Sequence, residues 1–348
     1  MPELGVSPTT SDSNENSAAP LRGLRRALFV LLTLLPKNAM SRAMGRVTSM
    51  RLPGPIQRAE IRLFAAIAGV AIEEARDDVA DFASLQQFFT RALRPGARPL
   101  EGDDNTLVSP CDGAWGESGT IESGTMMQVK GRAYRVADLL CDEDLATAYE
   151  GGRYATFYLS PRDYHRFHTP TAGRVTRVEY IPGALWPVNS IGLLGVDGLF
   201  AQNERLCAYL ELGPGAFEPG PGALELGPGA FEPGPGALEL SPGEGAGVQS
   251  GDSGPGSSLG IAMIAVGATM VGSVRLTFDE MRTNVANGSP ERRDFAANAP
   301  TFARGEEWGT FEFGSTIVML TPPGEIELDS RATGTALRLG EAIGSVRR

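Results

Sequence analysis

Two histidines carry any imidazole chemistry that this sequence can perform near neutral pH. His165 and His168 lie three residues apart in the segment YLSPRDYHRFHTP, residues 158–170, and the sequence has no other histidine. A general base or a metal ligand of this type would therefore come from this segment. Zinc binding is the weaker alternative, because no further histidine and no paired cysteines complete a ligand shell. A structural role, packing against the neighbouring aromatic side chains, is also open.

A second reactive position is the Gly314-Ser315 pair in TFEFGSTIVML, residues 310–320. This stretch is typical of a strand, and a glycine inside a strand marks a bulge or a close backbone approach. Gly-Ser by itself is also a common turn. If the backbone is held bent, Ser315 Oγ attacks the Gly314 carbonyl and converts the amide into an ester. Elimination would then leave dehydroalanine, which hydrolyses to a pyruvoyl group and ammonia.

Serine is a weak nucleophile, so this step needs a base and an orienting partner for the base. Asp112, in the segment SPCDG at 109–113, is a candidate partner, although aspartate is common in turns for backbone reasons alone. A serine hydrolase is an alternative use of the same residues. It is disfavoured because the sequence around Ser315 has no GxSxG elbow. Cys111 is better interpreted as a buried, inert thiol than as a nucleophile.

The elements that must position these residues are mostly strands. Short apolar runs, many of them β-branched or aromatic, predict strands at Tyr154–Leu159, Val175–Ile181, Leu206–Leu210, Ile261–Val266, Val271–Phe278 and Ile317–Leu320. Few helical stretches separate them, which argues against parallel βαβ units. We therefore predict a mainly β (α+β) protein. Residues 95–348 form an antiparallel β-sheet catalytic domain, and residues 20–94 form an N-terminal amphipathic helical arm.

The arm differs from the rest of the chain in charge. The whole protein carries a net charge of −11, which argues against a nucleic-acid partner. Between Pro20 and Arg62, however, nine Lys or Arg residues stand against the single acid Glu60. A basic, apolar arm on an acidic protein favours an anionic membrane surface. A non-enzymatic membrane-binding β module is a rival interpretation, but it leaves the YHRFH and FGST segments unexplained.

Residues 1–19 are polar and predicted to be disordered. The apolar run Ala27–Leu35 that follows Arg25-Arg26 is too short to span a bilayer. A signal peptide is the alternative to an interfacial helix, but further basic residues follow and no clear cleavage site does. A second helical stretch, Ile56–Ile72, fits a core-facing helix and membrane contact about equally well.

Two further features concern the surface and the compartment. Residues 211–224 read ELGPGAFEPGPGAL and are repeated without change at 225–238, within a Gly/Pro-rich insertion at about 211–258. Such a segment does not form a packed core and is predicted to be a surface insertion. The three cysteines, Cys111, Cys141 and Cys207, include no CxxC pair, which fits a reducing compartment.

Taken together, these segments resemble the phosphatidylserine decarboxylase family in its bacterial form. YLSPRDYHRFH is similar to the histidine segment of that family, SPCDG to its aspartate segment, and FGST at 313–316 to its LGST cleavage motif. Three further segments are also similar to the family: VGATMVGSV at 266–274, PGALWPVN at 182–189 and QNER at 202–205. Phe313 in place of leucine and the insertion after Leu210 are the departures.

The resemblance implies that the chain cleaves itself between Gly314 and Ser315, giving a large chain (1–314) that stays bound to a small chain (315–348). It implies that Asp112, His168 and Ser315 form the self-processing triad, and that His165 acts in decarboxylation. Ser315 would become a covalent pyruvoyl cofactor that forms a Schiff base with phosphatidylserine, releases carbon dioxide and yields phosphatidylethanolamine. No metal is expected. The resemblance further implies a homodimer, bound peripherally at the cytoplasmic face of the cell membrane.

Overall fold

The computed structural model describes residues 36–128, 132–188, 190–212, 260–269, 273–295, 298–312 and 315–347. Four regions singled out in the sequence lie outside these ranges in whole or large part. They are the polar tail, the run Ala27–Leu35, nearly all of the Gly/Pro insertion, and the Phe313-Gly314 pair.

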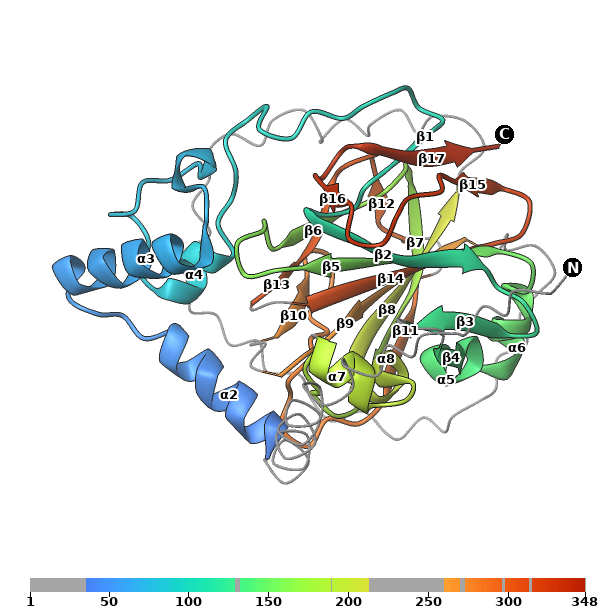
Figure 1. Cartoon of the computed structure of the whole chain (residues 1–348), viewed down its shortest axis with the longest axis horizontal. Coiled ribbons are helices and arrows are strands. Elements are labelled where there is room, and N and C mark those ends of the chain that lie inside the picture. The colour runs from blue at the N-terminus through green and yellow to red at the C-terminus, as the bar shows by residue number, and fades with distance from the viewer. Residues whose placement is uncertain are drawn as a thin grey trace, which may run out of the picture.

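A nine-stranded sheet forms the centre of the molecule (Figure 1). Its strand order is β11-β7-β8-β9-β14-β5-β2-β16, and β12 also pairs with β7. All of these pairs are antiparallel. The strands are β2 (Gly113–Thr120), β5 (Arg153–Leu159), β7 (Gly173–Ile181), β8 (Arg205–Leu212), β9 (Ile261–Val266), β11 (Glu291–Asp294), β12 (Thr301–Phe302), β14 (Ser315–Thr321) and β16 (Ala336–Leu337).

Three smaller sheets accompany it. One has the order β1-β17-β15, the second has the order β10-β13-β6, and the third pairs β3 with β4. Their strands are β1 (Thr106–Val108), β3 (Thr125–Gln128), β4 (Arg132–Arg135), β6 (Arg166–His168), β10 (Val274–Leu276), β13 (Glu307–Phe311), β15 (Ile326–Leu328) and β17 (Ala342–Val346).

The described helices are short, except for two in the N-terminal arm. They are α2 (Lys37–Thr48), α3 (Gly54–Ala68), the 3₁₀ turn η1 (Ile72–Glu74), α4 (Leu85–Phe89), α5 (Val136–Leu140), α6 (Glu143–Ala148), α7 (Ser190–Gly195) and α8 (Leu199–Gln202). Helices α2, α3 and α4 lie together at one side of the sheet (Figure 1). Among the described residues, no helix has the length and apolar character needed to cross a bilayer.

The central sheet is buried on both faces, because alternate residues of each strand enter different cores. Ile317 and Met319 belong to the core that includes the β6, β10 and β13 side chains Phe167, Val274 and Trp308. Val318 and Leu320 belong to the other core, which includes the α5 and α8 side chains Leu139, Leu140, Leu199 and Phe200. Period-two alternation with both faces covered explains why the central strands read as continuous apolar runs.

Helix α3 shows why the sequence 54–69 is helical and where it ends. Pro55 lies in the first turn, where its missing N–H costs no helical hydrogen bond. Gly69 ends the helix at φ 79°, a left-handed conformation that glycine adopts without strain. Ile61 and Ala65 are buried and pack with Phe88 in a separate small core. The core-facing interpretation of this helix is therefore confirmed.

The predicted mainly β, antiparallel architecture with an N-terminal helical region is confirmed. The strand Ile261–Val266 has the predicted bounds. Within the described part of the run Val271–Phe278, residues 273–278, the strand is β10, Val274–Leu276. The stretch Thr310–Leu320 is not a single interrupted strand. β13 ends at Phe311 in one sheet, and β14 begins at Ser315 in another.

Candidate active site

A tight turn between β5 and β6 leads into the two histidines: His165 is the last residue of the turn, and His168 is the last residue of β6. The main-chain N and the Oγ of Ser160 both donate to Asp163 Oδ2, at 2.6 and 2.7 Å. The main-chain N of Asp163 returns a hydrogen bond to Ser160 O at 2.9 Å. Farther along, the main-chain O of His165 accepts from Phe311 N of β13 at 2.8 Å. The segment is therefore held at both ends by backbone contacts.

His168 is oriented as a neutral imidazole whose lone pair is on Nε2. Its Nδ1 lies 2.9 Å from Gly305 O, and because a carbonyl only accepts, Nδ1 carries the proton. Tyr164 Oη donates to Nε2 over 3.3 Å. Burial lowers the pKa of His168 below its usual value, against the opposing effect of the Gly305 hydrogen bond. His168 can therefore act as a base near neutral pH.

His165 has the same tautomer in a drier place. Its Nδ1 donates to Asp163 O at 2.9 Å, and its ring packs on Phe89 with 3.9 Å between centroids. The side chain is fully buried, and Nε2 has no partner among the described residues. Burial lowers the pKa of His165 to about 3, so the ring is neutral at physiological pH. Because buried polar atoms are normally satisfied, this lone pair is a candidate contact for a bound molecule.

Asp112 lies beside the histidine segment but is bound by a different residue. Gly113 has φ 148°, and a Cβ there would meet Tyr158 O of β5 at 2.2 Å, so only glycine lets this segment approach so closely. His168 N donates to Pro110 O at 2.8 Å. The Asp112 carboxylate, however, accepts two hydrogen bonds from Arg98, at 2.8 Å from Nε and 2.6 Å from Nη2.

Arg98 therefore takes the place that sequence reasoning gave to His168. Leu339 N also donates to Asp112 Oδ1 at 2.9 Å, while Arg98 Nη2 reaches Glu74 of the arm at 2.7 Å. Burial opposes the charge on Arg98, but its hydrogen bonds to Asp112 and Glu74 raise its pKa above the usual value. Within the described residues, Gly305 rather than Asp112 orients the His168 ring. The pairing of Asp112 with His168 stays a prediction.

The backbone register brings Ser315 next to this turn. Ser315 is the first residue of β14 and pairs with Leu159, the last residue of β5 and the neighbour of Ser160. On its other side β14 pairs with β9, where Thr316 is opposite Val266. Ser315, the histidine segment and Asp112 therefore lie in one part of the fold. Gly314, the other half of the predicted cleavage site, lies outside the described residues.

Sequence reasoning missed Arg98, Tyr164 and the Gly305 carbonyl. Only Tyr164 had a signal, since it lies inside the histidine segment. It also missed Glu204, a buried carboxyl in the QNER segment that accepts from Tyr180 Oη at 3.1 Å and Asn284 N at 2.8 Å. Burial raises the pKa of Glu204 to about 7, against the effect of these hydrogen bonds. Cys111 is buried, and burial raises its thiol pKa well above the usual value, as expected for an inert thiol.

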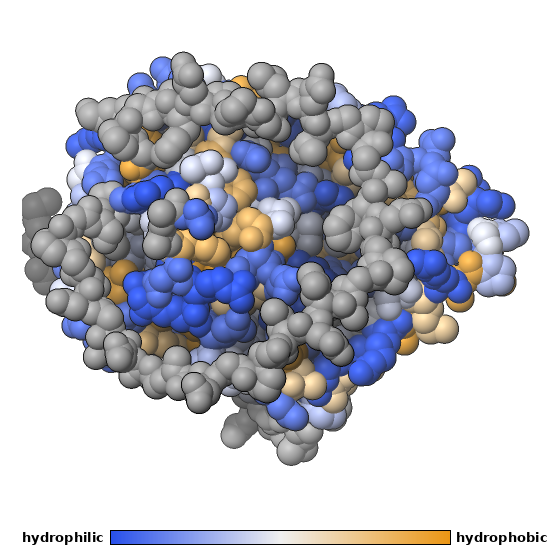
Figure 2. Space-filling view, turned by 180° about the vertical axis from the view of Figure 1, so that it is seen from behind, coloured by the Kyte–Doolittle hydropathy of each residue, from blue (hydrophilic) through white to orange (hydrophobic). Residues whose placement is uncertain are grey.

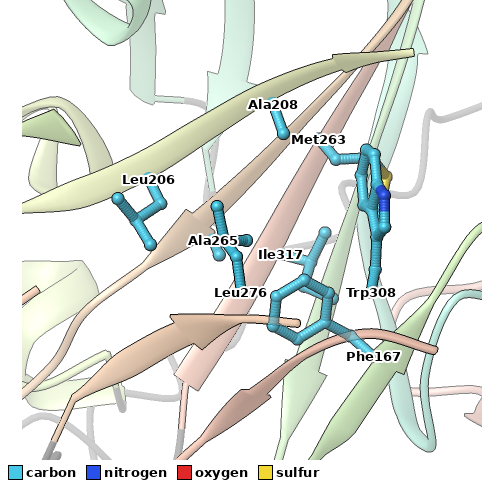
Figure 3. Close-up of a pocket in the computed structure, with 8 residues that line it drawn as sticks. All are labelled: Phe167, Leu206, Ala208, Met263, Ala265, Leu276, Trp308 and Ile317. Carbon is cyan, nitrogen blue, oxygen red and sulfur yellow. The ribbon is translucent and has the colours of Figure 1, made fainter. Parts of the chain in front are cut away.

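A ligand pocket or a metal site elsewhere in the described residues would be an alternative to this site. A pocket beside β14 is lined by apolar side chains from six strands, including Phe167, Met263 and Ile317 (Figure 3). Among the described side chains that line it, Trp308 alone carries an N–H, and none is an acid, a base or a nucleophile. In the described part of the chain, no group of three or more His, Cys, Asp or Glu side chains could hold a metal ion.

Fold and site together define an antiparallel β enzyme in which a buried histidine, His165, and a half-buried one, His168, lie near a serine that begins a central strand. The family model for phosphatidylserine decarboxylase matches residues 85–221 and 247–345. A phosphatidylserine decarboxylase proenzyme of Anaeromyxobacter sp. (strain K) is 40% identical over 323 residues, covering 92% of this chain and 98% of that protein. The chain belongs to the phosphatidylserine decarboxylase family.

Two further relatives carry the same name. The phosphatidylserine decarboxylase proenzyme of Myxococcus xanthus (strain DK1622) is 33% identical over 317 residues, which are 91% of this chain and 97% of that protein. The proenzyme of Brevibacillus brevis (strain 47) is 33% identical over 322 residues, 92% of this chain and 98% of that protein. The similarity therefore extends over nearly the whole chain and is not confined to the histidine segment.

Proposed function

We propose that this protein is a pyruvoyl-dependent phosphatidylserine decarboxylase that matures by cleaving itself between Gly314 and Ser315. One observation carries the proposal within this family: Ser315 begins β14 opposite Leu159, and the chain runs from Leu159 through a short turn to His165 and then to His168 in β6. The word proenzyme in the names of its relatives supports maturation by cleavage.

In the self-cleavage step, we assign to His168 Nε2 the Ser315 hydroxyl proton: this nitrogen holds the lone pair, and the Ser315 hydroxyl takes the place of the Tyr164 hydroxyl that donates to it in the structure. The Ser315 oxygen then bonds to the Gly314 carbonyl carbon, the C–N bond between Gly314 and Ser315 breaks, and the Ser315 nitrogen takes up the proton from His168, so that the amide becomes an ester. Elimination removes the Ser315 Cα proton and breaks the Cβ–O bond, so that Gly314 ends the large chain as a carboxylate. Water then hydrolyses the dehydroalanine to the pyruvoyl group and ammonia. We assign Asp112 the role of supporting the imidazolium through the local field, since its carboxylate favours the protonated form of His168.

A buried polar atom near the start of β14 supports a pyruvoyl group at this position. His165 Nε2 is buried and has no partner among the described residues, and His165 belongs to the segment that follows Leu159, the residue opposite Ser315. When formed, the group supplies a ketone that takes up the substrate amine and withdraws electrons as carbon dioxide leaves. We assign His165 the task of handling protons of the bound substrate, at its amine and at the reacting carbon, since its Nε2 has no partner among the described residues.

We further propose that the arm binds the cytoplasmic face of the cell membrane. Ile56, Leu63 and Ile67 are spaced at 7 and 4 residues along α3 and are 56%, 62% and 79% exposed. They form an apolar stripe that the small core of the arm does not cover, with Arg58 and Arg62 on the same helix. The opposite side of the molecule from Figure 1 also exposes apolar side chains near its centre, bordered by hydrophilic ones (Figure 2).

The resemblance to the family supports a homodimer in addition. Light scattering on the purified protein measures this directly, and a mass equal to one copy of the 348-residue protein would exclude the homodimer.

The free thiols of Cys111, Cys141 and Cys207 fit the reducing, cytoplasmic side of the membrane.

Intact-mass measurement tests the central proposal. We expect the purified protein to contain two chains, 1–314 and 315–348, with a pyruvoyl group at the start of the second. Ser315→Ala is the matched control and should stay a single chain, because it has no hydroxyl to attack Gly314. A wild-type chain that stays intact and still decarboxylates phosphatidylserine would refute the proposal.

A further inference from the structure

Arg91 is a buried cation that follows α4 and is only 3% exposed. Its Nη2 donates to the main-chain O of Arg162 at 3.3 Å and of Asp163 at 3.5 Å. Its Nε and Nη1 are buried and have no hydrogen-bond partner in the described part of the chain. Buried donors are normally satisfied, because burial removes the water that would otherwise bind them. A buried guanidinium with two N–H donors that lack acceptors lowers the stability of the fold.

Neighbouring carboxylates do not neutralise Arg91. Asp112 and Glu74 both bind Arg98, at 2.6 and 2.7 Å. Burial lowers the pKa of Arg91, and the fields of Asp112 and Glu74 offset this only in part. Among the described residues, Arg98 thus has two carboxylate partners and Arg91 has none within ion-pair distance.

Arg91 lies next to His165. The Asp163 carbonyl accepts from both, at 3.5 Å from Arg91 Nη2 and 2.9 Å from His165 Nδ1. Consecutive phenylalanines of α4 support the two groups. The Arg91 guanidinium lies 5.4 Å from the ring centroid of Phe88, and the His165 ring lies 3.9 Å from that of Phe89.

The unpaired hydrogen-bonding atoms of these two side chains are complementary: one side chain offers donors and the other offers an acceptor. Arg91 offers N–H donors, and His165 offers the Nε2 lone pair. A molecule that satisfies both must bring an oxyanion and an N–H group within a few atoms of each other. The headgroup of an aminophospholipid carries both.

Building on the proposed function, we propose that Arg91 is the anion-binding residue of the headgroup site. Its Nε and Nη1 pair with an oxyanion of the substrate headgroup, while His165 Nε2 accepts from the substrate amine. The paired donors of a guanidinium suit both a carboxylate and a phosphodiester. The two sources share this chemistry, and the experiment below separates them.

The test uses the mature, cleaved protein and soluble amines, so that the membrane arm plays no part. Each amine is incubated with the protein and cyanoborohydride, and the mass increase of the small chain is measured against concentration. Arg91→Gln should raise the concentration of glycerophosphoserine that gives half of the maximal increase by about 10- to 100-fold, the range of a lost charged hydrogen bond. Ethanolamine, which has no oxyanion, should be unaffected.

Two more amines identify the oxyanion. Serine has a carboxylate and no phosphate, and glycerophosphoethanolamine has a phosphate and no carboxylate. The one whose half-maximal concentration rises in Arg91→Gln carries the group that Arg91 binds. Arg91→Lys keeps the charge and should show the same change with a smaller factor. Arg94→Gln is the matched control, since Arg94 Nε is occupied by Ala75 O at 3.0 Å, and it should match the wild type.

A second measurement needs no variant and covers the case in which Arg91→Gln does not mature. In the wild type, methyl phosphate or acetate should compete with glycerophosphoserine and not with ethanolamine. The proposal would be overturned if the half-maximal concentration of glycerophosphoserine were the same in wild type and Arg91→Gln. It would also be overturned if that of ethanolamine rose by the same factor in Arg91→Gln, or if neither methyl phosphate nor acetate competed with glycerophosphoserine. A wild-type small chain that captures no amine at all would instead contradict the proposed function.

Discussion

The central sheet buries its apolar side chains on both faces, whereas helix α3 of the N-terminal arm buries them on one face and exposes them on another. In the sheet, Ile317 and Val318 point to different faces and both are buried. In the arm, Ile61 is buried while Leu63 and Ile67 on the same helix are exposed. A site that positions a serine and two histidines needs a rigid frame, whereas a surface that meets lipid must leave apolar area uncovered.

The two regions are nevertheless joined by polar contacts. Glu74 of the arm binds Arg98, which holds Asp112. Lys37 of α2 lies 3.9 Å over the Trp186 ring, and Asn38 Nδ2 donates to Gly183 O at 3.1 Å. The arm therefore contributes to the surroundings of the site as well as to the surface.

The largest effects should come from the histidines of the sheet region. His168→Ala should block or greatly slow chain cleavage, because the base for Ser315 is removed. His165→Ala should still be cleaved, while decarboxylation falls by about 10²- to 10⁴-fold, the usual contribution of a general acid–base group. Intact mass and carbon dioxide release measure the two steps. If His165→Ala stays uncleaved and His168→Ala matures, the two roles are exchanged.

The next largest effect tests the contact between arm and sheet. Arg98→Met leaves the buried Asp112 carboxylate without its cation, and breaking such a pair costs about 3–5 kcal/mol of stability. Glu74→Gln is the matched control, because it leaves Arg98 and Asp112 paired, and it should cost about 1 kcal/mol or less. Urea unfolding of both in the uncleaved Ser315→Ala background measures the difference. Equal losses would show that the arm contact matters as much as the Asp112 pair.

A smaller effect concerns pH. The folded pKa of His165 is about 3 against 6.5 for the free group, so the unfolded chain binds the proton first and stability falls as pH drops below 6.5. The folded pKa of Glu204 is about 7 against 4.5, so its contribution is present at low pH and is lost as pH rises toward 7. Between pH 5 and 6.5 the two slopes oppose each other, and neither exceeds about 1.4 kcal/mol per pH unit, the value for one full proton.

Variants separate the two slopes. In the Ser315→Ala background, His165→Gln should flatten the rise of stability with pH, and Glu204→Gln should steepen it. Urea unfolding at several pH values measures both. A change of the same sign in the two variants would contradict the assigned protonation states.

The smallest effect belongs to the exposed stripe of α3. Leu63→Ser and Ile67→Ser should each weaken binding to anionic vesicles by about 1 kcal/mol, less than the full transfer of such a side chain because only part of it inserts. Ala66→Ser, at another exposed position of α3, should bind as the wild type does. Co-sedimentation with vesicles at low and high salt measures this. Unchanged binding in both variants would move the membrane site away from α3.

The pattern of apolar residues along the sequence predicted the bounds of a strand well where glycines flank the apolar run. Strand β9 has the predicted bounds because a buried apolar run lies between Gly260 and Gly267. The order of strands could not be predicted, because β14 pairs with β5 and β9, which come from distant parts of the sequence. Asp112, His165 and His168 were found through a resemblance in short motifs. Arg98 and the Gly305 carbonyl were missed because their roles arise only from tertiary contacts.

The position of Ser315 at the start of β14 has a thermodynamic consequence. In the proposed mature protein the small chain supplies β14 to the middle of the main sheet, with β5 and β9 of the large chain on either side. It also supplies β15, β16 and β17, so its release requires the sheets to come apart. Unfolding of the mature protein is then a dissociation into two polypeptides, and its midpoint rises with protein concentration by mass action. For uncleaved Ser315→Ala as a monomer, the same transition is unimolecular and its midpoint does not depend on concentration.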